Sequence, residues 1–169
     1  MYTGLSLKGG PMIIRYPRGI GEGVAWKEAS YEALPVGKGE KLLDGKGVAI
    51  LGIGPVVNRA LAAARRCLSE TGKAPAVYDL RFLKPLDEDI LREAGKFKAV
   101  ITVEDGSLKG GLFGAVSEFF AGRTGAPVIK GMGIPDRFIG QDTQKAQWAL
   151  CGLDEESLFE LITDMLKNL

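Results

Sequence analysis

The sequence contains no histidine, and its 169 residues include only two cysteines, Cys67 and Cys151. Without an imidazole side chain, the Ser-His-Asp and Cys-His nucleophile systems, histidine general bases and the usual zinc sites are excluded. The two cysteines lie far apart in the sequence, and we expect both to be reduced and partly buried in helices. We therefore assign no catalytic residue and no metal ligand to this chain.

A dominant charge and a long apolar run are also missing. Lys and Arg (22) nearly balance Asp and Glu (21), so no overall field favours nucleic acid, and no basic amphipathic stripe indicates a membrane surface. No apolar stretch approaches the length of a transmembrane span, and the N-terminus lacks the pattern of a signal peptide. We predict a cytoplasmic globular protein, with 46% hydrophobic residues to form a core.

Short apolar runs alternate with helical patterns along most of the chain. The runs cover residues 47–54, 76–82, 100–103 and 128–132, and the alternation predicts parallel strands joined by helices. Residues 32–43 should add an irregular edge strand, and residues 11–16 are one further strand candidate. We predict an α/β fold with three αβα layers and a mostly parallel sheet of about five strands, with the 47–54 run near its middle.

The helical patterns carry recognisable end signals. The helix after residue 55 should pack on the sheet through one face, formed by Val57, Ala60, Leu61, Ala64 and Leu68. Gly72 suits its C-terminal cap. Asp87, Thr143 and Asp154 are predicted N-terminal caps of three later helices.

Two short motifs allow a ligand interpretation. The run Gly52-Ile53-Gly54 resembles part of a dinucleotide fingerprint, but the position of its third glycine holds Val57. We favour a tight turn into a helix that Pro55 begins. The acidic run of Asp87, Glu88 and Asp89 is better explained by capping a helix N-terminus than by metal binding or acid–base catalysis.

The run 99–105 delivers Glu104 and Asp105 to the end of a strand, just before the Gly110-Gly111 turn. Ligands and partner segments gather at the carboxyl ends of parallel strands, so a site is expected here. The alternative is that Glu104 only bonds to loop amides, which we rate above a binding role. Glu104, Gly110 and Gly111 are therefore candidates for a domain interface or for organising the loop.

Several separated motifs resemble the C-terminal part of the 1-deoxy-D-xylulose-5-phosphate synthase family. The segments are Met1-Tyr2-Thr3, Arg15-Tyr16-Pro17-Arg18-Gly19, Val36-Gly37-Lys38-Gly39, Asp79-Leu80-Arg81-Phe82-Leu83-Lys84-Pro85-Leu86-Asp87, Thr102-Val103-Glu104-Asp105-Gly106, Lys109-Gly110-Gly111 and Gly133-Ile134-Pro135-Asp136-Arg137-Phe138. The resemblance implies a transferase of the transketolase type that uses thiamine diphosphate to condense pyruvate with glyceraldehyde 3-phosphate. Its product feeds isoprenoid, thiamine and pyridoxal phosphate synthesis.

The resemblance also implies that most of the enzyme is absent from this chain. Residues 1–20 would be the tail of a preceding pyrimidine-binding domain, residues 21–46 a linker and edge strand, and residues 47–169 the transketolase C-terminal-like domain. Thiamine diphosphate and magnesium would be held by upstream domains, because the Gly-Asp-Gly magnesium motif and the activating glutamate lie there in the family. The isolated chain is expected to bind no cofactor, to be inactive, and to associate with those domains or as a homodimer.

In the family, the arginine matching Arg18 looks to be a ligand for the phosphate of the acceptor. Its guanidinium would be presented between Pro17 and Gly19, the alternative being a solvated loop charge. Arg15 is the weaker candidate, since inside a strand it could equally form a structural ion pair.

The chain departs from the family pattern at Phe113, Gly114 and Gln141, which puts the usual domain contacts of these loops in question. Two other interpretations remain. One is a stand-alone interaction or regulatory module, and the other is a separate C-terminal subunit of another transketolase-group enzyme.

Overall fold

The computed structural model describes residues 1–17, 27–28 and 30–169. These divide into two compact units, Met1–Val36, called here the N-terminal segment, and Gly37–Leu169, called the sheet domain. Arg18 and the first residues of the predicted linker, 21–26, lie outside the described residues.

The sheet domain contains a five-stranded sheet with the order β1-β3-β2-β4-β5. The strands are β1 (Glu40–Leu43), β2 (Val48–Ile53), β3 (Ala76–Asp79), β4 (Ala99–Ser107) and β5 (Val128–Ile134). β2 pairs in parallel with β3 and β4, and β4 pairs in parallel with β5, whereas β1 runs antiparallel to β3. The predicted mostly parallel sheet is confirmed, with the 47–54 run at its centre.

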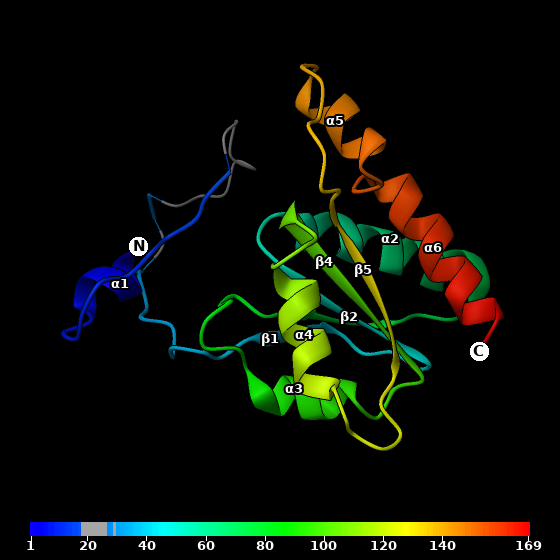
Figure 1. Cartoon of the computed structure of the whole chain (residues 1–169), viewed down its shortest axis with the longest axis horizontal. Coiled ribbons are helices and arrows are strands. Elements are labelled where there is room, and N and C mark those ends of the chain that lie inside the picture. The colour runs from blue at the N-terminus through cyan, green and yellow to red at the C-terminus, as the bar shows by residue number, and fades with distance from the viewer. Residues whose placement is uncertain (18–26, 29) are drawn as a thin grey trace. The chain divides into compact units, whose positions relative to one another are not determined.

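Helices cover both faces of this sheet, which gives the three predicted layers (Figure 1). The helices are α2 (Val56–Thr71), α3 (Glu88–Ala94), α4 (Leu112–Phe120), α5 (Gln144–Leu150) and α6 (Glu155–Lys167). Alternate residues of β2 point to opposite faces: Val48 and Ile50 join the core under α2 and α6, while Ala49 and Leu51 join the core under α3 and α4. Burial on both faces explains why this strand is a continuous apolar run.

The predicted caps are confirmed. The carboxylate of Asp87 accepts hydrogen bonds from the amides of Asp89 and Ile90, Thr143 caps α5, and Asp154 caps α6. Gly72 adopts φ 71° and donates its amide to the carbonyl of Leu68. These local bonds satisfy backbone groups that a helix end would otherwise leave unpaired.

One predicted helix face was partly wrong. Leu68 is 44% exposed, whereas Ala63 and Cys67 are buried in the core between α2, α6 and the sheet. The small side chains let α2 approach its neighbours closely, and the larger leucine stays on the outer side of the helix.

Two strand ends also differ from the prediction. The edge strand covers only Glu40–Leu43, because Pro35 lacks an amide donor and Gly37 turns the chain with φ 72°. β3 ends at Asp79, because Arg81 adopts φ 57° and donates its amide to Asp79 Oδ1 at 3.0 Å. That turn replaces the last three residues of the predicted strand.

The N-terminal segment contains the helix α1 (Tyr2–Ser6), which was not predicted, and none of its described residues is buried. Tyr2 stacks on Tyr31 with ring centroids 6.1 Å apart, and the amide of Leu34 donates to Thr3 Oγ1 at 2.9 Å. The predicted strand at 11–16 was wrong: these residues have no regular structure, and Ile13 is 96% exposed. The described part of this segment offers no second strand with which it could pair.

Candidate functional site

The carboxyl end of β4 holds Glu104 inside the domain, where its side chain is 4% exposed. Glu104 Oε1 accepts a hydrogen bond from the amide of Phe113, in the first turn of α4, at 3.2 Å. Phe113 follows Gly111, the N-terminal cap residue of α4, by two positions. The start of a helix can hold an anion, but here the carboxylate of Glu104 already bonds to that amide and faces the positive end of the helix dipole.

The two glycines before α4 are needed for different reasons: Gly110 for its backbone conformation, and Gly111 for the lack of a side chain. Gly110 adopts φ 74°, a conformation that favours glycine. Gly111 has an ordinary φ, but a Cβ at this position would lie 2.5 Å from Glu104 Oε1. The carboxylate, the turn and the helix start therefore form one tightly packed loop.

Two of the three residues at which the chain departs from the family pattern, Phe113 and Gly114, lie in the first turn of α4, directly after this loop. The ring of Phe113 fills space left by Gly131 of β5, where a Cβ would lie 2.6 Å from Phe113 Cδ2. Gly114 faces open space, and Gln141 is exposed. Phe113 is thus accommodated by a glycine on the neighbouring strand.

A small hollow of about 160 Å³ lies between the ends of β4 and β5 and the helix α5. It is lined by Asp105, Ile134, Ile139, Gln144, Gln147, Trp148, Cys151 and Leu153. Burial raises the pKa of the Cys151 thiol, Arg137 works against that rise, and Asp105 adds to it. Cys151 is therefore held as the neutral thiol, which is a poor nucleophile.

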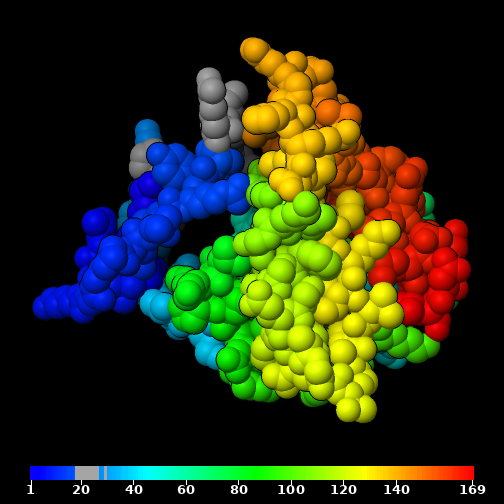
Figure 2. All heavy atoms as spheres, viewed as in Figure 1, coloured from blue at the N-terminus to red at the C-terminus, as the bar shows by residue number. Residues whose placement is uncertain are grey.

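The helix α5 beside this hollow contributes no buried residue, and Figure 2 shows it projecting with the preceding loop (orange). Its inner side is held by stacking, because the guanidinium carbon of Arg59 lies 3.7 Å from the ring centroid of Trp148. Arg59 Nε also donates to the carbonyl of Leu153 at 2.8 Å. These contacts secure an element that lacks a core of its own.

A second polar cluster lies at the end of β3 and was missed in the sequence. Arg81 pairs with Glu40 of β1, and its amide donates to the carboxylate of Asp79. Burial raises the pKa of Asp79, although the bond from the Arg81 amide opposes the rise. The signal lay in the Asp79-Leu80-Arg81-Phe82 run, whose charged residues interrupt an otherwise apolar strand.

The structure does not test the two predicted phosphate ligands. Arg15 lies in the irregular part of the N-terminal segment with an exposed side chain, and Arg18 lies outside the described residues. Among the described residues, no three His, Cys, Asp or Glu side chains gather in a way that could hold a metal ion. None of the described helices combines the length and the apolar character needed to cross a membrane.

Comparison of the sequence with known families and proteins gives a consistent result. Residues 37–158 match the family described as "Transketolase, C-terminal domain". The 1-deoxy-D-xylulose-5-phosphate synthases of Bacteroides thetaiotaomicron and Cytophaga hutchinsonii are 47% and 42% identical to the chain, over 99% and 98% of its length. The chain spans only 27% and 26% of those relatives, about a quarter of each.

Solved structures show the same relationship. A structure titled "Split gene transketolase, inactive beta4 tetramer" is 32% identical, with a TM-score of 0.71 over 80% of this chain and 44% of that chain. The transketolase of Campylobacter jejuni, 19% identical with a TM-score of 0.54 over 76% of this chain and 18% of that one, shares the fold. The chain belongs to the transketolase C-terminal domain family, and within that family its sequence is similar to 1-deoxy-D-xylulose-5-phosphate synthases.

Proposed function

We propose that this chain is the C-terminal domain of a 1-deoxy-D-xylulose-5-phosphate synthase. That enzyme condenses pyruvate with glyceraldehyde 3-phosphate, with loss of carbon dioxide, in the cytoplasm, and supplies isoprene and thiamine biosynthesis. The observation that carries the proposal is the extent of the similarity, which reaches 47% identity over 99% of the chain. It therefore includes the N-terminal segment, which lies before the family match at residues 37–158.

In this proposal the chain is catalytically incomplete by itself. Thiamine diphosphate would supply the stabilised carbanion, and upstream domains would hold it together with magnesium. The sequence has no Gly-Asp-Gly motif, and its described part gathers no carboxylate cluster for magnesium. The contribution of this chain would be to pack against the cofactor-binding domains, with Glu104, Gly110 and Gly111 keeping the strand-end loop in shape.

The N-terminal segment supports an origin in a preceding domain. None of its described residues is buried, and Leu5 and Ile13 are 88% and 96% exposed. Apolar side chains in such a segment gain stability only when another surface covers them. We assign residues 1–20 to the tail of the pyrimidine-binding domain, residues 21–46 to the linker and edge strand, and residues 47–169 to the C-terminal domain.

Reconstitution tests the proposal. The purified chain is mixed with a separately produced upstream part of the Bacteroides thetaiotaomicron synthase, and deoxyxylulose phosphate formation is measured with both cofactors present. We expect product only from the mixture, and no magnesium-dependent binding of thiamine diphosphate to the chain alone in calorimetry. Micromolar cofactor binding by the chain alone, or an associated but inactive mixture, would contradict the proposal.

A second candidate is a separate C-terminal subunit of another transketolase-group enzyme. The similar split-gene transketolase favours it, because that protein is described as an inactive β4 tetramer. A stand-alone interaction or regulatory module is a third candidate. The coding sequence upstream of Met1 distinguishes them, since an in-frame continuation with a Gly-Asp-Gly motif supports the synthase and a separate gene supports the others.

Self-association is a further part of the proposal. The chain is expected to self-associate weakly or to form a homodimer, because domains of this type resemble those that line subunit interfaces in the transketolase group. Light scattering over a range of concentrations should give a mass above that of one chain. A monomeric mass at the highest concentration would contradict this part of the proposal.

Arg18 is the proposed ligand for the phosphate of glyceraldehyde 3-phosphate, with Arg15 as the weaker candidate. A guanidinium grips phosphate oxygens in a two-pronged geometry that an ammonium does not reproduce. In the reconstituted enzyme, Arg18→Lys should raise the KM for glyceraldehyde 3-phosphate at least about tenfold while changing that for pyruvate little. Arg15→Lys is the matched variant, and equal effects of Arg18→Lys on both substrates would contradict the assignment.

A further inference from the structure

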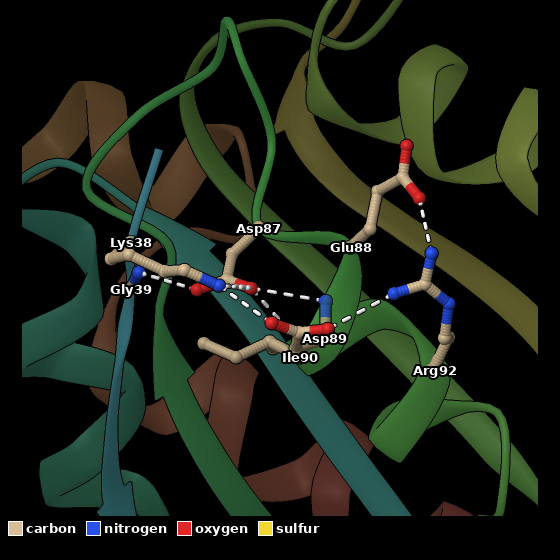
Figure 3. Close-up of polar contacts among 7 residues, drawn as sticks. All are labelled: Lys38, Gly39, Asp87, Glu88, Asp89, Ile90 and Arg92. Carbon is tan, nitrogen blue, oxygen red and sulfur yellow. Dashed lines mark hydrogen bonds and ion pairs between the residues drawn. The ribbon is translucent and has the colours of Figure 1, made fainter. Parts of the chain in front are cut away.

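Two segments that are distant in the sequence meet at the start of α3, where Gly39 bonds to Asp87, 48 residues further along the chain (Figure 3). Asp87 Oδ2 accepts a hydrogen bond from the amide of Gly39 at 3.0 Å, and Lys38 Nζ lies 3.4 Å from Asp87 Oδ1. Lys38 Nζ also lies 2.6 Å from Asp89 Oδ2. Residues 37–39, called here the strap, are thus tied to the first turn of α3.

The carboxylate of Asp87 bonds both to the start of α3 and to the strap. Its Oδ1 caps α3 by accepting hydrogen bonds from the amides of Asp89 and Ile90 at 3.0 and 3.4 Å, while its Oδ2 holds the strap. The side chain is 4% exposed, and burial alone would favour the neutral acid. The amides of Gly39, Ile90 and Asp89, together with Lys38, nevertheless hold the pKa of Asp87 below its ordinary value.

The backbone of the strap fits closely against its surroundings. Gly37 adopts φ 72°, and a Cβ there would lie 2.8 Å from Pro85 Cγ. A Cβ at Gly39 would lie 2.6 Å from the carbonyl oxygen of Asp79. Because Gly37 and Gly39 have no side chain, the backbone of the strap packs directly against the end of β3 and the turn before α3. This places the amide of Gly39 at hydrogen-bonding distance from Asp87.

The strap leads directly into β1, which is an edge strand of four residues and pairs only with β3. Its first residues are attached by further charged contacts: Glu40 pairs with Arg81, and Lys41 Nζ lies 2.5 Å from Glu93 Oε1. By contrast, the first five residues of β2 are buried. The strap and the first two residues of β1 are therefore held largely by polar contacts, and only Leu42 and Leu43 of β1 pack against the apolar core under α2 and α6.

We propose that Asp87 is a latch that fastens the strap and β1 to the domain, and that breaking the latch lets them open together while the parallel strands β3, β2, β4 and β5 stay folded. Among the polar contacts of the strap, the bond from Gly39 to the buried carboxylate of Asp87 dominates. The Lys38 and Asp89 side chains are 51% and 70% exposed, so water screens their pairing. The latch sets the point at which the preceding residues leave the domain. This role holds whatever reaction the domain serves.

Hydrogen exchange on the full 169-residue chain tests the latch. Asp87→Ser keeps a good N-terminal cap for α3 but is too short to reach the amide of Gly39. We expect the amide of Gly39 and the β1 amides bonded to β3 to exchange at least about tenfold faster than in the unchanged chain, with β2 and β4 changing by less than about twofold. Asp154→Ser is the matched control, because Asp154 caps α6 without touching the strap.

A second variant keeps the proposal testable if Asp87→Ser fails to fold. Lys38→Met retains most of the side-chain length and removes only the charge, so the Gly39 amide should exchange less than about threefold faster than in the unchanged chain, because its bond to Asp87 remains. Unchanged strap exchange in Asp87→Ser, or equal acceleration in β1, β2 and β4, would overturn the proposal. Exchange of the Gly39 amide about tenfold faster in Lys38→Met would overturn it as well, because the exposed ion pairs and not the bond to Asp87 would then hold the strap.

Discussion

The carboxylate of Glu104 occupies the space into which any side chain at position 111 would project. A Cβ on Gly111 would lie 2.5 Å from Glu104 Oε1 and even closer to Oε2. Glu104 is buried and bonded to the amide of Phe113, so it cannot move aside without losing that bond. The pair explains why a glycine stands here although its φ is ordinary.

Gly111→Ala should lower the free energy of unfolding by about 1–3 kcal/mol, because it forces a buried carboxylate off its hydrogen bond. Urea denaturation followed by circular dichroism measures the loss. Adding Glu104→Ala to Gly111→Ala should cost less than the sum of the two single substitutions, since the clash then disappears. Additive losses would show that the two residues do not compete for space.

Gly114, three residues after Gly111, has room for a side chain. It lies inside α4, and a Cβ there would meet no atom within 4 Å. Gly114→Ala should therefore stabilise the chain by roughly 0.5–1 kcal/mol, the usual gain when alanine replaces glycine within a helix. The same denaturation measurement checks it, and a loss of stability would mean that the position is covered by a surface of an associated copy.

The Thr102 hydroxyl makes no hydrogen bond to any of the described residues and is buried in β4. Valine has the same shape without the polar atom. Thr102→Val should raise the free energy of unfolding by about 1 kcal/mol, because folding would no longer strip water from an unpaired hydroxyl. Thr143→Val is a control with the opposite sign, since it removes the cap of α5 and should cost about 1 kcal/mol.

The fold could be predicted from the sequence because its strongest signals are local. The apolar run of β2, the caps Asp87 and Asp154, and the terminating Gly72 each follow from the chemistry of a few neighbouring residues. The failed strand at 11–16 has the same local pattern, but a strand forms only when a partner supplies the other half of its hydrogen bonds. The local sequence pattern therefore predicted helices and apolar strands well, but it did not predict whether a strand finds a partner.

The contacts between distant motifs could not be predicted. The meeting of Gly39 with Asp87, and of Glu40 with Arg81, depends on the edge strand turning back along β3. The same holds for Phe113, whose ring fills the space left by Gly131 on another strand. Each sequence motif was recognisable, but only the tertiary structure shows which motifs act as pairs.

Cys151 should react slowly with thiol reagents at neutral pH. Burial raises the pKa of its thiol, so little of the reactive thiolate is present. In a Cys67→Ser variant, which leaves Cys151 as the only cysteine, labelling of the folded chain should be at least about tenfold slower than labelling in urea. Equal rates would show that the hollow beside α5 opens freely.

The stability of the chain at alkaline pH should depend on Tyr78. The Tyr78 ring is buried, and its hydroxyl donates to Glu93 Oε1 at 2.8 Å. Burial, reinforced by the carboxylate of Glu93, raises the pKa of Tyr78 to about 12. The folded state therefore favours the neutral phenol, and the stability gained from it is complete below about pH 10, where tyrosine titrates in an unfolded chain. It should be lost as the pH rises from about 10 to 12.

Lys41 contributes with the same sign, because its hydrogen bond to Glu93 raises the pKa of its ammonium group. The variant Tyr78→Phe keeps the pairing of Lys41 with Glu93, so a comparison of the two chains isolates the phenol. Tyr78→Phe should be less stable at neutral pH but should lose less stability between pH 10 and 12. The difference between the tyrosinate absorbance curves of the folded chains should rise near pH 12, and a difference centred near pH 10 would contradict the role of burial.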